Sequence, residues 1–155
     1  MEQRTAGDVS AALRLFELAP RITRMENAVL GRGSPPLTFR QFRLLGRIAE
    51  GDDTITRLGR FATISLPAIS ESVEGLVQKG LVRRTADPRD RRTARLDLTD
   101  AGVQALAVGG DLLTEAAEQL LMEIAGSRRD RLANDLTAID RCVADYLRRE
   151  GDVAD

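Results

Sequence analysis

The most constraining part of this sequence is residues 81–99, where two strand patterns flank a polar turn. Residues 82–85 and 94–98 have the β-branched or alternating character of short strands. Between them, Asp87-Pro88-Arg89-Asp90-Arg91-Arg92 is too polar, and too interrupted by proline, to continue either strand. These residues therefore predict a β-hairpin whose tip projects into solvent.

The predicted hairpin carries a concentrated positive charge. Residues 83–95 hold six arginines and two aspartates, a local charge of +4 in a chain whose net charge is -1. Residues 36–95 hold twelve basic and seven acidic residues (+5), whereas residues 96–155 hold six and thirteen (-7). A tip of this kind suits a polyanionic partner, although a merely solvated turn has the same composition.

A helical pattern with two unlike faces precedes the hairpin. Ser65 can cap this helix, Pro67 falls in its first turn, and Gly80 ends it. The apolar residues recur at helical spacing, at Ile69, Val73, Leu76 and Val77, and the opposite side is small and polar. A shorter helical segment at residues 54–62 and a turn at 63–64 come before it. This is the order of elements in a winged helix-turn-helix.

Several motifs in this region occur together in a known family. They are Ile64-Ser65-Leu66-Pro67-Ala68-Ile69-Ser70, Leu76, Gly80-Leu81-Val82-Arg83-Arg84, the tip at residues 87–92, and Leu98-Thr99-Asp100-Ala101-Gly102. In their order and spacing they resemble the MarR family of bacterial transcriptional regulators. The resemblance implies a mainly α fold with a small β-hairpin wing (α+β), in which N- and C-terminal dimerisation helices flank the winged helix-turn-helix.

Helical patterns on both sides of the winged unit fit this arrangement. Residues 9–30 form one pattern, with a kink or break expected at Pro20, and a capping box formed by Thr38 and Gln41 opens the next. After the hairpin, Thr99 is expected to cap a helix that has a weak point at Gly109-Gly110, and Ser127 to cap the last helix. We therefore expect three parts: residues 1–36 and 100–155 for dimerisation, and residues 37–99 for DNA binding.

The resemblance assigns the DNA contacts. The helix after residue 64 should enter the major groove and bring small side chains near base edges or phosphates. Arg92 matches the arginine that the family inserts into the minor groove, and Asp90 matches the acid that orients it. The predicted base and phosphate contacts are Ser65, Pro67, Ala68, Ser70, Glu71, Ser72, Arg83, Arg84, Arg89, Arg91 and Arg40.

Glu71 departs from the family pattern, because many members have a basic or neutral residue there. A carboxylate facing phosphate is unfavourable. Two roles for Glu71 remain open: its carboxylate accepts a hydrogen bond from a cytosine amino group, or it pairs with a neighbouring arginine.

Partners other than DNA follow from the resemblance and from composition. A homodimer fits paired half-sites, and the alternative is a monomeric helical bundle around the winged unit. In the family, a small aromatic or anionic effector commonly binds between the dimerisation helices and the winged unit. Side chains that could line such a crevice here are Leu13, Arg14, Phe16, Arg43 and Leu44. A winged module that binds an acidic protein in place of DNA is the second functional class.

Enzymatic chemistry has little support in this sequence. The chain has no histidine and only one cysteine, Cys142, so it offers no imidazole base, cysteine cluster or intrachain disulfide. The sequence predicts neither a metal site nor a cofactor. We expect Cys142 to be buried and inert. The single cysteine, the lack of a signal peptide and the absence of a membrane-spanning apolar run predict a cytoplasmic protein.

Overall fold

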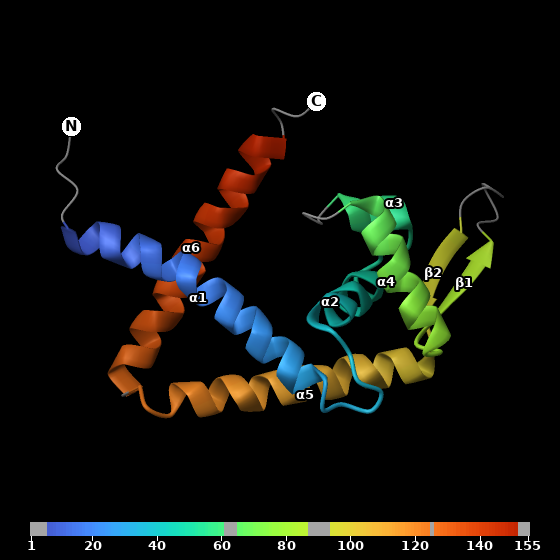
Figure 1. Cartoon of the computed structure of the whole chain (residues 1–155), viewed down its shortest axis with the longest axis horizontal. Coiled ribbons are helices and arrows are strands. Elements are labelled where there is room, and N and C mark those ends of the chain that lie inside the picture. The colour runs from blue at the N-terminus through green and yellow to red at the C-terminus, as the bar shows by residue number, and fades with distance from the viewer. Residues whose placement is uncertain (1–5, 61–64, 87–93, 125, 152–155) are drawn as a thin grey trace. The chain divides into compact units, whose positions relative to one another are not determined.

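The computed structural model describes residues 6–60, 65–86, 94–124 and 126–151 (Figure 1). These residues form two compact units, one within residues 1–114 and the other within 115–155. Six helices and two strands occur in the described residues: α1 (Ala6–Leu30), α2 (Phe39–Ala49), α3 (Ile55–Gly59), α4 (Leu66–Gln78), β1 (Val82–Ala86), β2 (Ala94–Leu98), α5 (Asp100–Leu121) and α6 (Gly126–Gly151). The predicted mainly α fold with one β-hairpin is confirmed.

Helix α1 continues through Pro20, so the expected break there is wrong. A proline inside a helix removes one backbone N–H and leaves the carbonyl four residues earlier, here that of Phe16, without its helical donor. Residues 13–24 are all exposed in the single chain, and the helix continues on both sides of the proline.

Helix α2 begins with the predicted capping box. The Gln41 N–H donates to Thr38 Oγ1, and the Thr38 N–H donates to Gln41 Oε1, each over 3.2 Å. The pair satisfies two backbone donors that the first helical turn leaves free. Leu45 and Ile48 are buried on its inner face, and Gly51, at φ 101°, follows its end.

The next two helices form the helix-turn-helix. Helix α3 is shorter than the expected 54–62, and Thr54 caps it by accepting the Arg57 N–H over 3.2 Å. Helix α4 begins after Ser65, which occupies the cap position without a side-chain hydrogen bond. Gly80 takes φ 70°, the left-handed conformation expected after a helix end. The expected turn at residues 63–64 lies outside the described residues.

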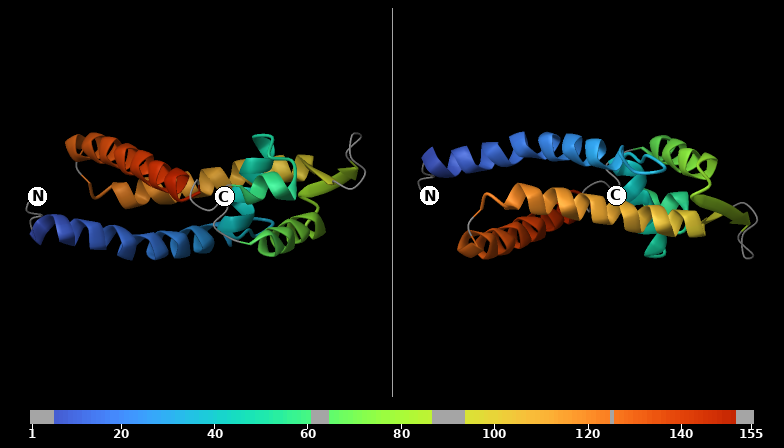
Figure 2. Two further views of the ribbon diagram at one scale, coloured as in Figure 1. Left: turned by 90° about the horizontal axis from the view of Figure 1, so that it is seen from above. Right: turned by 90° about the horizontal axis from the view of Figure 1, so that it is seen from below.

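Strands β1 and β2 form the predicted antiparallel hairpin. Their register places Val82 opposite Leu98 and Arg84 opposite Leu96. Both views in Figure 2 show the hairpin beside α4, in the same unit as α2 and α3. The predicted tip, residues 87–92, lies outside the described residues.

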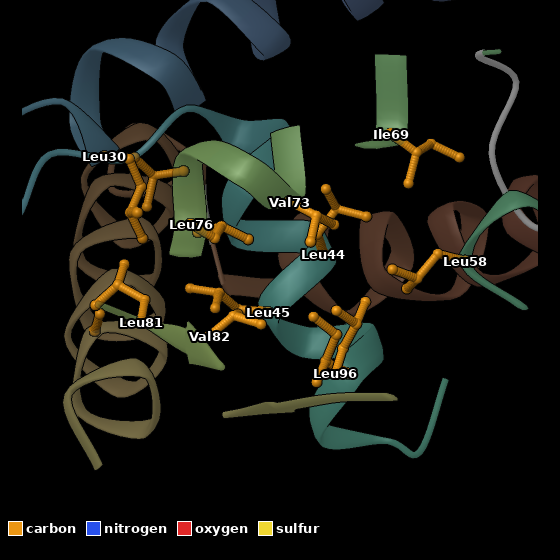
Figure 3. Close-up of a cluster of buried hydrophobic side chains, with 13 residues drawn as sticks. Leu30, Leu44, Leu45, Leu58, Ile69, Val73, Leu76, Leu81, Val82 and Leu96 are labelled. Carbon is orange, nitrogen blue, oxygen red and sulfur yellow. The ribbon is translucent and has the colours of Figure 1, made fainter. Parts of the chain in front are cut away.

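A single apolar core holds this unit together. Figure 3 shows side chains that converge from α1, α2, α4 and both strands. The most deeply buried are Leu30, Leu45, Ile69, Val73, Leu76, Leu81 and Leu96. Burying one leucine or isoleucine side chain contributes about 1.5–3 kcal/mol to stability. Because α4 and the hairpin both contribute side chains to this core, it holds them together.

The start of α5 packs closely on that core through small residues. Thr99 caps the helix as predicted, since its Oγ1 accepts the Gly102 N–H over 3.0 Å. Gly102, Ala105 and Gly109 are buried along one side of the helix. A Cβ on Gly109 would lie 2.8 Å from the Phe42 ring. The helix is continuous through the expected weak point at Gly109-Gly110, and Gly109 allows close packing against Phe42.

The second unit contains the end of α5 and helix α6. Helix α6 begins at Gly126, one residue before the predicted cap, so the expected N-terminal boundary is wrong. Its apolar side chains Leu136, Ile139, Val143 and Leu147 are exposed in the single chain. Cys142 on the same helix is also exposed, which contradicts its expected burial. No helix within the described ranges combines the length and apolar character needed to cross a bilayer.

Candidate nucleic-acid interface

Helix α4 presents two chemically different faces. Ile69, Val73 and Leu76 have no exposed surface and anchor the inner face in the core. The predicted contact residues lie outside this buried face, in the first two turns of the helix and just before it: Ser65, Pro67 and Glu71 are exposed, and Ala68, Ser70 and Ser72 are half-buried. Apart from Glu71 these side chains are short, so another molecule can approach the helix backbone closely there.

The hydroxyl group of Ser72 has a defined orientation. Ser72 Oγ donates to the Ala68 carbonyl over 2.9 Å, one helical turn earlier. The proton of this hydroxyl is therefore used within the helix, while its oxygen lone pairs remain free to accept. Ser72 can serve a base or a bridging water as an acceptor in this conformation.

An open cleft brings Arg40 together with part of the α4 surface. Its volume is about 770 Å³, and Arg40, Glu71 and Ser72 line it with polar side chains of α1 and the first turn of α2. No arginine in the described ranges lies within ion-pair distance of Glu71. The described residues thus show no arginine paired with Glu71, and Glu71 and Arg40 line the same cleft.

The two predicted arginines of strand β1 form weak ion pairs. Arg83 Nε lies 3.8 Å from Asp97 Oδ2, and an Arg84 guanidinium nitrogen lies 3.2 Å from Glu74 Oε2 on α4. Both arginine side chains are at least 40% exposed. Since exposed pairs of this kind contribute about 0–1 kcal/mol, either arginine can exchange its carboxylate for a phosphate at small cost.

An acidic residue that the sequence analysis did not select ties the hairpin to the helix-turn-helix. Asp53 Oδ1 accepts from Arg57 over 2.9 Å, and Asp53 Oδ2 accepts from Arg95 Nε on β2 over 2.7 Å. The Asp53 carbonyl also accepts the Leu96 N–H over 2.8 Å. The hydrogen bond from Arg95, assisted by the charges of Arg95 and Arg57, lowers the pKa of the Asp53 carboxyl. Asp53 therefore remains ionised and holds β2 against the residues before α3.

The five candidate effector residues lie in different environments. Leu13 and Phe16 are 60% and 77% exposed on α1, and Arg14 is exposed beside them. Leu44 is buried in the core. Arg43 is exposed and lies 6.0 Å from the centre of the Phe39 ring. None of the five lines the cleft that contains Arg40.

One further carboxyl, on α1, has a perturbed environment. Burial raises the pKa of the Glu26 carboxyl, and the positive charge of Arg43 opposes that shift. Among the described residues there is no group of three or more side chains suited to hold a metal ion.

The wing-tip residues complete the predicted interface. Arg89, Asp90, Arg91 and Arg92 all lie outside the described residues, so their predicted roles stay predictions. The described interface consists of the outer face of α4, the cleft with Arg40 and the paired arginines of β1.

Comparison with known proteins identifies the family. A model of the MarR family matches residues 36–93. The chain is 30% identical over 141 residues to YwaE of Bacillus subtilis (strain 168), described as an uncharacterized HTH-type transcriptional regulator. That match covers 90% of this chain and 79% of YwaE.

Solved structures show the same fold. Wild-type MarR of E. coli in its apo form is 23% identical with a TM-score of 0.71, covering 89% of this chain and 98% of that one. Streptococcus pneumoniae FabT in complex with DNA is 16% identical with a TM-score of 0.72, covering 88% and 97%. The chain belongs to the MarR family of winged-helix transcriptional regulators.

Proposed function

We propose that this protein is a sequence-specific DNA-binding regulator that reads the major groove with the outer face of α4. The observation that carries this proposal is the two-faced character of α4. Its inner face is fixed by three fully buried side chains, and its exposed surface carries mainly short or polar groups, with Leu66 in the first turn as an exposed apolar side chain. Hydroxyl groups and methyl groups at such a face can approach base edges and thymine methyls.

The arginines around α4 provide contacts to the DNA backbone. Arg40 lies in the cleft beside α4, and Arg83 and Arg84 lie on the adjoining strand. Phosphate contacts of this kind give affinity and a steep salt dependence but little sequence preference. In this proposal Arg89 and Arg91 add further phosphate contacts, while Arg92, oriented by Asp90, enters a narrow minor groove, where negative potential is enhanced.

The regulator acts as a homodimer on a pseudo-palindromic operator. Exposed apolar side chains on α1, including Phe16, and on α6, including Ile139 and Val143, support this part of the proposal. Apolar groups gathered on an exposed face mark an interaction surface. A two-fold dimer then places two copies of α4 in successive major grooves, about 34 Å apart.

The regulator is a repressor in the cytoplasm that releases DNA when a small aromatic or anionic effector binds. The family resemblance supports this part of the proposal. Arg14 and Arg43 provide exposed positive charge for an anion, and Leu13 and Phe16 provide exposed apolar surface. Leu44 is a residue of α2 whose side chain is buried in the core, so it can respond to an effector only through packing.

The experiment compares two variants that add the same negative charge at different places. Ala68→Glu puts a carboxylate on the outer face of α4, and Ala101→Glu puts one on the exposed first turn of α5. Binding is measured by fluorescence anisotropy on a duplex selected by the wild-type protein from a random library. We expect Ala68→Glu to weaken binding at least about tenfold and Ala101→Glu to change it less than about twofold. Equal effects of both variants would exclude α4 as the reading element.

A further inference from the structure

Lys79 is the only lysine in a chain that has 23 basic residues. It occupies the C-terminal cap position of α4. Its Nζ donates to the Pro36 carbonyl over 2.7 Å and to Gln41 Oε1 over 2.9 Å. These acceptors belong to the loop before α2 and to the first turn of α2. A single ammonium group thus joins the end of α4 to the start of α2.

The chemistry of this contact favours lysine over arginine. An ammonium group is compact and directs three donors around one atom, so it can serve two acceptors that converge on one point. A guanidinium group is planar and spreads its donors along a rigid fork. Every other basic residue of the chain is arginine, so the contact at Lys79 uses the one side chain that suits convergent acceptors.

Further hydrogen bonds at the first turn of α2 link the Lys79 contact to α1. Gln41 Oε1, which receives the Lys79 donor, also accepts the Thr38 N–H in the capping box. The next backbone donor, the Phe39 N–H, donates to Asn27 Oδ1 on α1 over 2.9 Å. Hydrogen bonds therefore connect α1, the start of α2 and the end of α4, all within one compact unit.

We propose that Lys79 is a positioning residue for DNA recognition, which sets the direction of α4 relative to α2 and α1 and thereby the half-site spacing that the dimer accepts. This inference rests on the proposed function. In a dimer formed through α1, a change in the direction of α4 in each subunit alters the distance between the two reading helices. Lys79 acts through Gln41 and Pro36 and makes no contact with DNA itself.

A direct phosphate contact is the competing role for a lysine, and the two roles predict different salt behaviour. Removing a phosphate contact weakens binding to all sequences and lowers the salt slope of log K by about 1. Removing a positioning contact weakens binding to the operator but leaves the affinity for scrambled DNA and its salt slope unchanged. Discrimination between operators of different spacing also falls, which loss of a phosphate contact does not cause.

The experiment uses Lys79→Met, with Lys79→Arg as its companion and Arg32→Met as the matched loss of one exposed positive charge. Each full-length variant is titrated by anisotropy against the selected operator, operators with one base pair added or removed between half-sites, and a scrambled duplex. Thermal unfolding of each variant checks the fold.

We expect Lys79→Met to weaken operator binding about tenfold, in keeping with the loss of a charge-assisted hydrogen bond, and scrambled-duplex binding less than about twofold. Its preference for one spacing should fall, and Lys79→Arg should restore little of it. Two results would overturn the positioning role alone. One is an equal loss of affinity for operator and scrambled DNA together with a lower salt slope, and the other is wild-type binding by Lys79→Met. Failure of the wild-type protein to bind any duplex at low salt would overturn the proposed function and this role with it.

Discussion

Replacing Gly102 with alanine tests the contact between α5 and the winged unit. The Gly102 backbone packs against Leu81, the residue between α4 and β1. A Cβ at position 102 would lie 2.0 Å from the Leu81 carbonyl oxygen. That oxygen also accepts the Thr99 N–H over 3.1 Å. Because the obstacle is backbone rather than a flexible side chain, either α5 or the start of β1 must move.

The size of the effect follows from two opposing contributions. Alanine in place of glycine in a helix interior is favourable by about 1 kcal/mol. Overpacking costs about 1–3 kcal/mol, and a backbone clash falls at the upper end of that range. We therefore expect Gly102→Ala to reduce the free energy of unfolding by about 2 kcal/mol, which for a chain of this size lowers the Tm by about 4–8 °C.

Gly110 in the same helix provides the control. A Cβ there meets no atom within 4 Å, so Gly110→Ala keeps only the gain in helix propensity. We expect its Tm to rise by about 2–4 °C. Both variants are measured by urea and thermal unfolding at one protein concentration, because the Tm of a protein that dimerises depends on its concentration. Two variants of equal stability would refute the packing argument.

Four further predictions concern the hairpin, the dimer and base recognition. Asp53→Asn should lower the free energy of unfolding by about 1 kcal/mol at pH 7, as measured by urea titration. Because the native pKa of Asp53 lies below its unfolded value of about 3.9, this contribution is present above that pH and is lost as the pH falls through the native pKa; a difference that does not decline at all as the pH is lowered below 3.9 would contradict it. Ile139→Asp should produce monomers in analytical ultracentrifugation, and an unchanged mass would argue against an interface at α6. Glu71→Ala should alter the preference for cytosine among operator variants, and equal discrimination before and after the change would eliminate that role. Arg92→Ala should weaken operator binding at least about tenfold without changing the fold or dimer, and full affinity would remove the wing from the mechanism.

The sequence was sufficient to predict elements whose signals are local. The apolar spacing of α4 and the glycine at position 80 locate that helix within a residue or two. The two strands follow from alternation alone, and β2 has the expected bounds. The capping box of α2 is likewise a pattern within four residues, and it is present.

Local rules were less reliable for the continuity and the bounds of helices. A kink or break was expected at Pro20, but α1 is continuous through it. Helix propensity predicted a weak point at Gly109-Gly110, but it contains no information about the Phe42 ring that a Cβ at Gly109 would meet. Helix α6 begins before Ser127, which shows that a capping residue does not by itself fix a boundary.

The side-chain contacts that organise the candidate interface join residues far apart in the chain. Asp53 and Arg95 are separated by 42 positions, and Lys79 and Pro36 by 43. No spacing rule relates such residues, because the separation depends on the fold of everything between them. The outer face of α4 could be predicted from its helical period, whereas the contacts that position that helix required the structure.

Sequence-specific DNA binding is the property on which the other proposals depend, and fluorescence anisotropy of the wild-type protein measures it. DNA from upstream of its own gene is compared with a scrambled duplex of equal length over a salt series. We expect tighter binding to the upstream DNA and a steep loss of affinity with salt. Absence of binding to either duplex at low salt would contradict it and favour a winged module that binds an acidic protein.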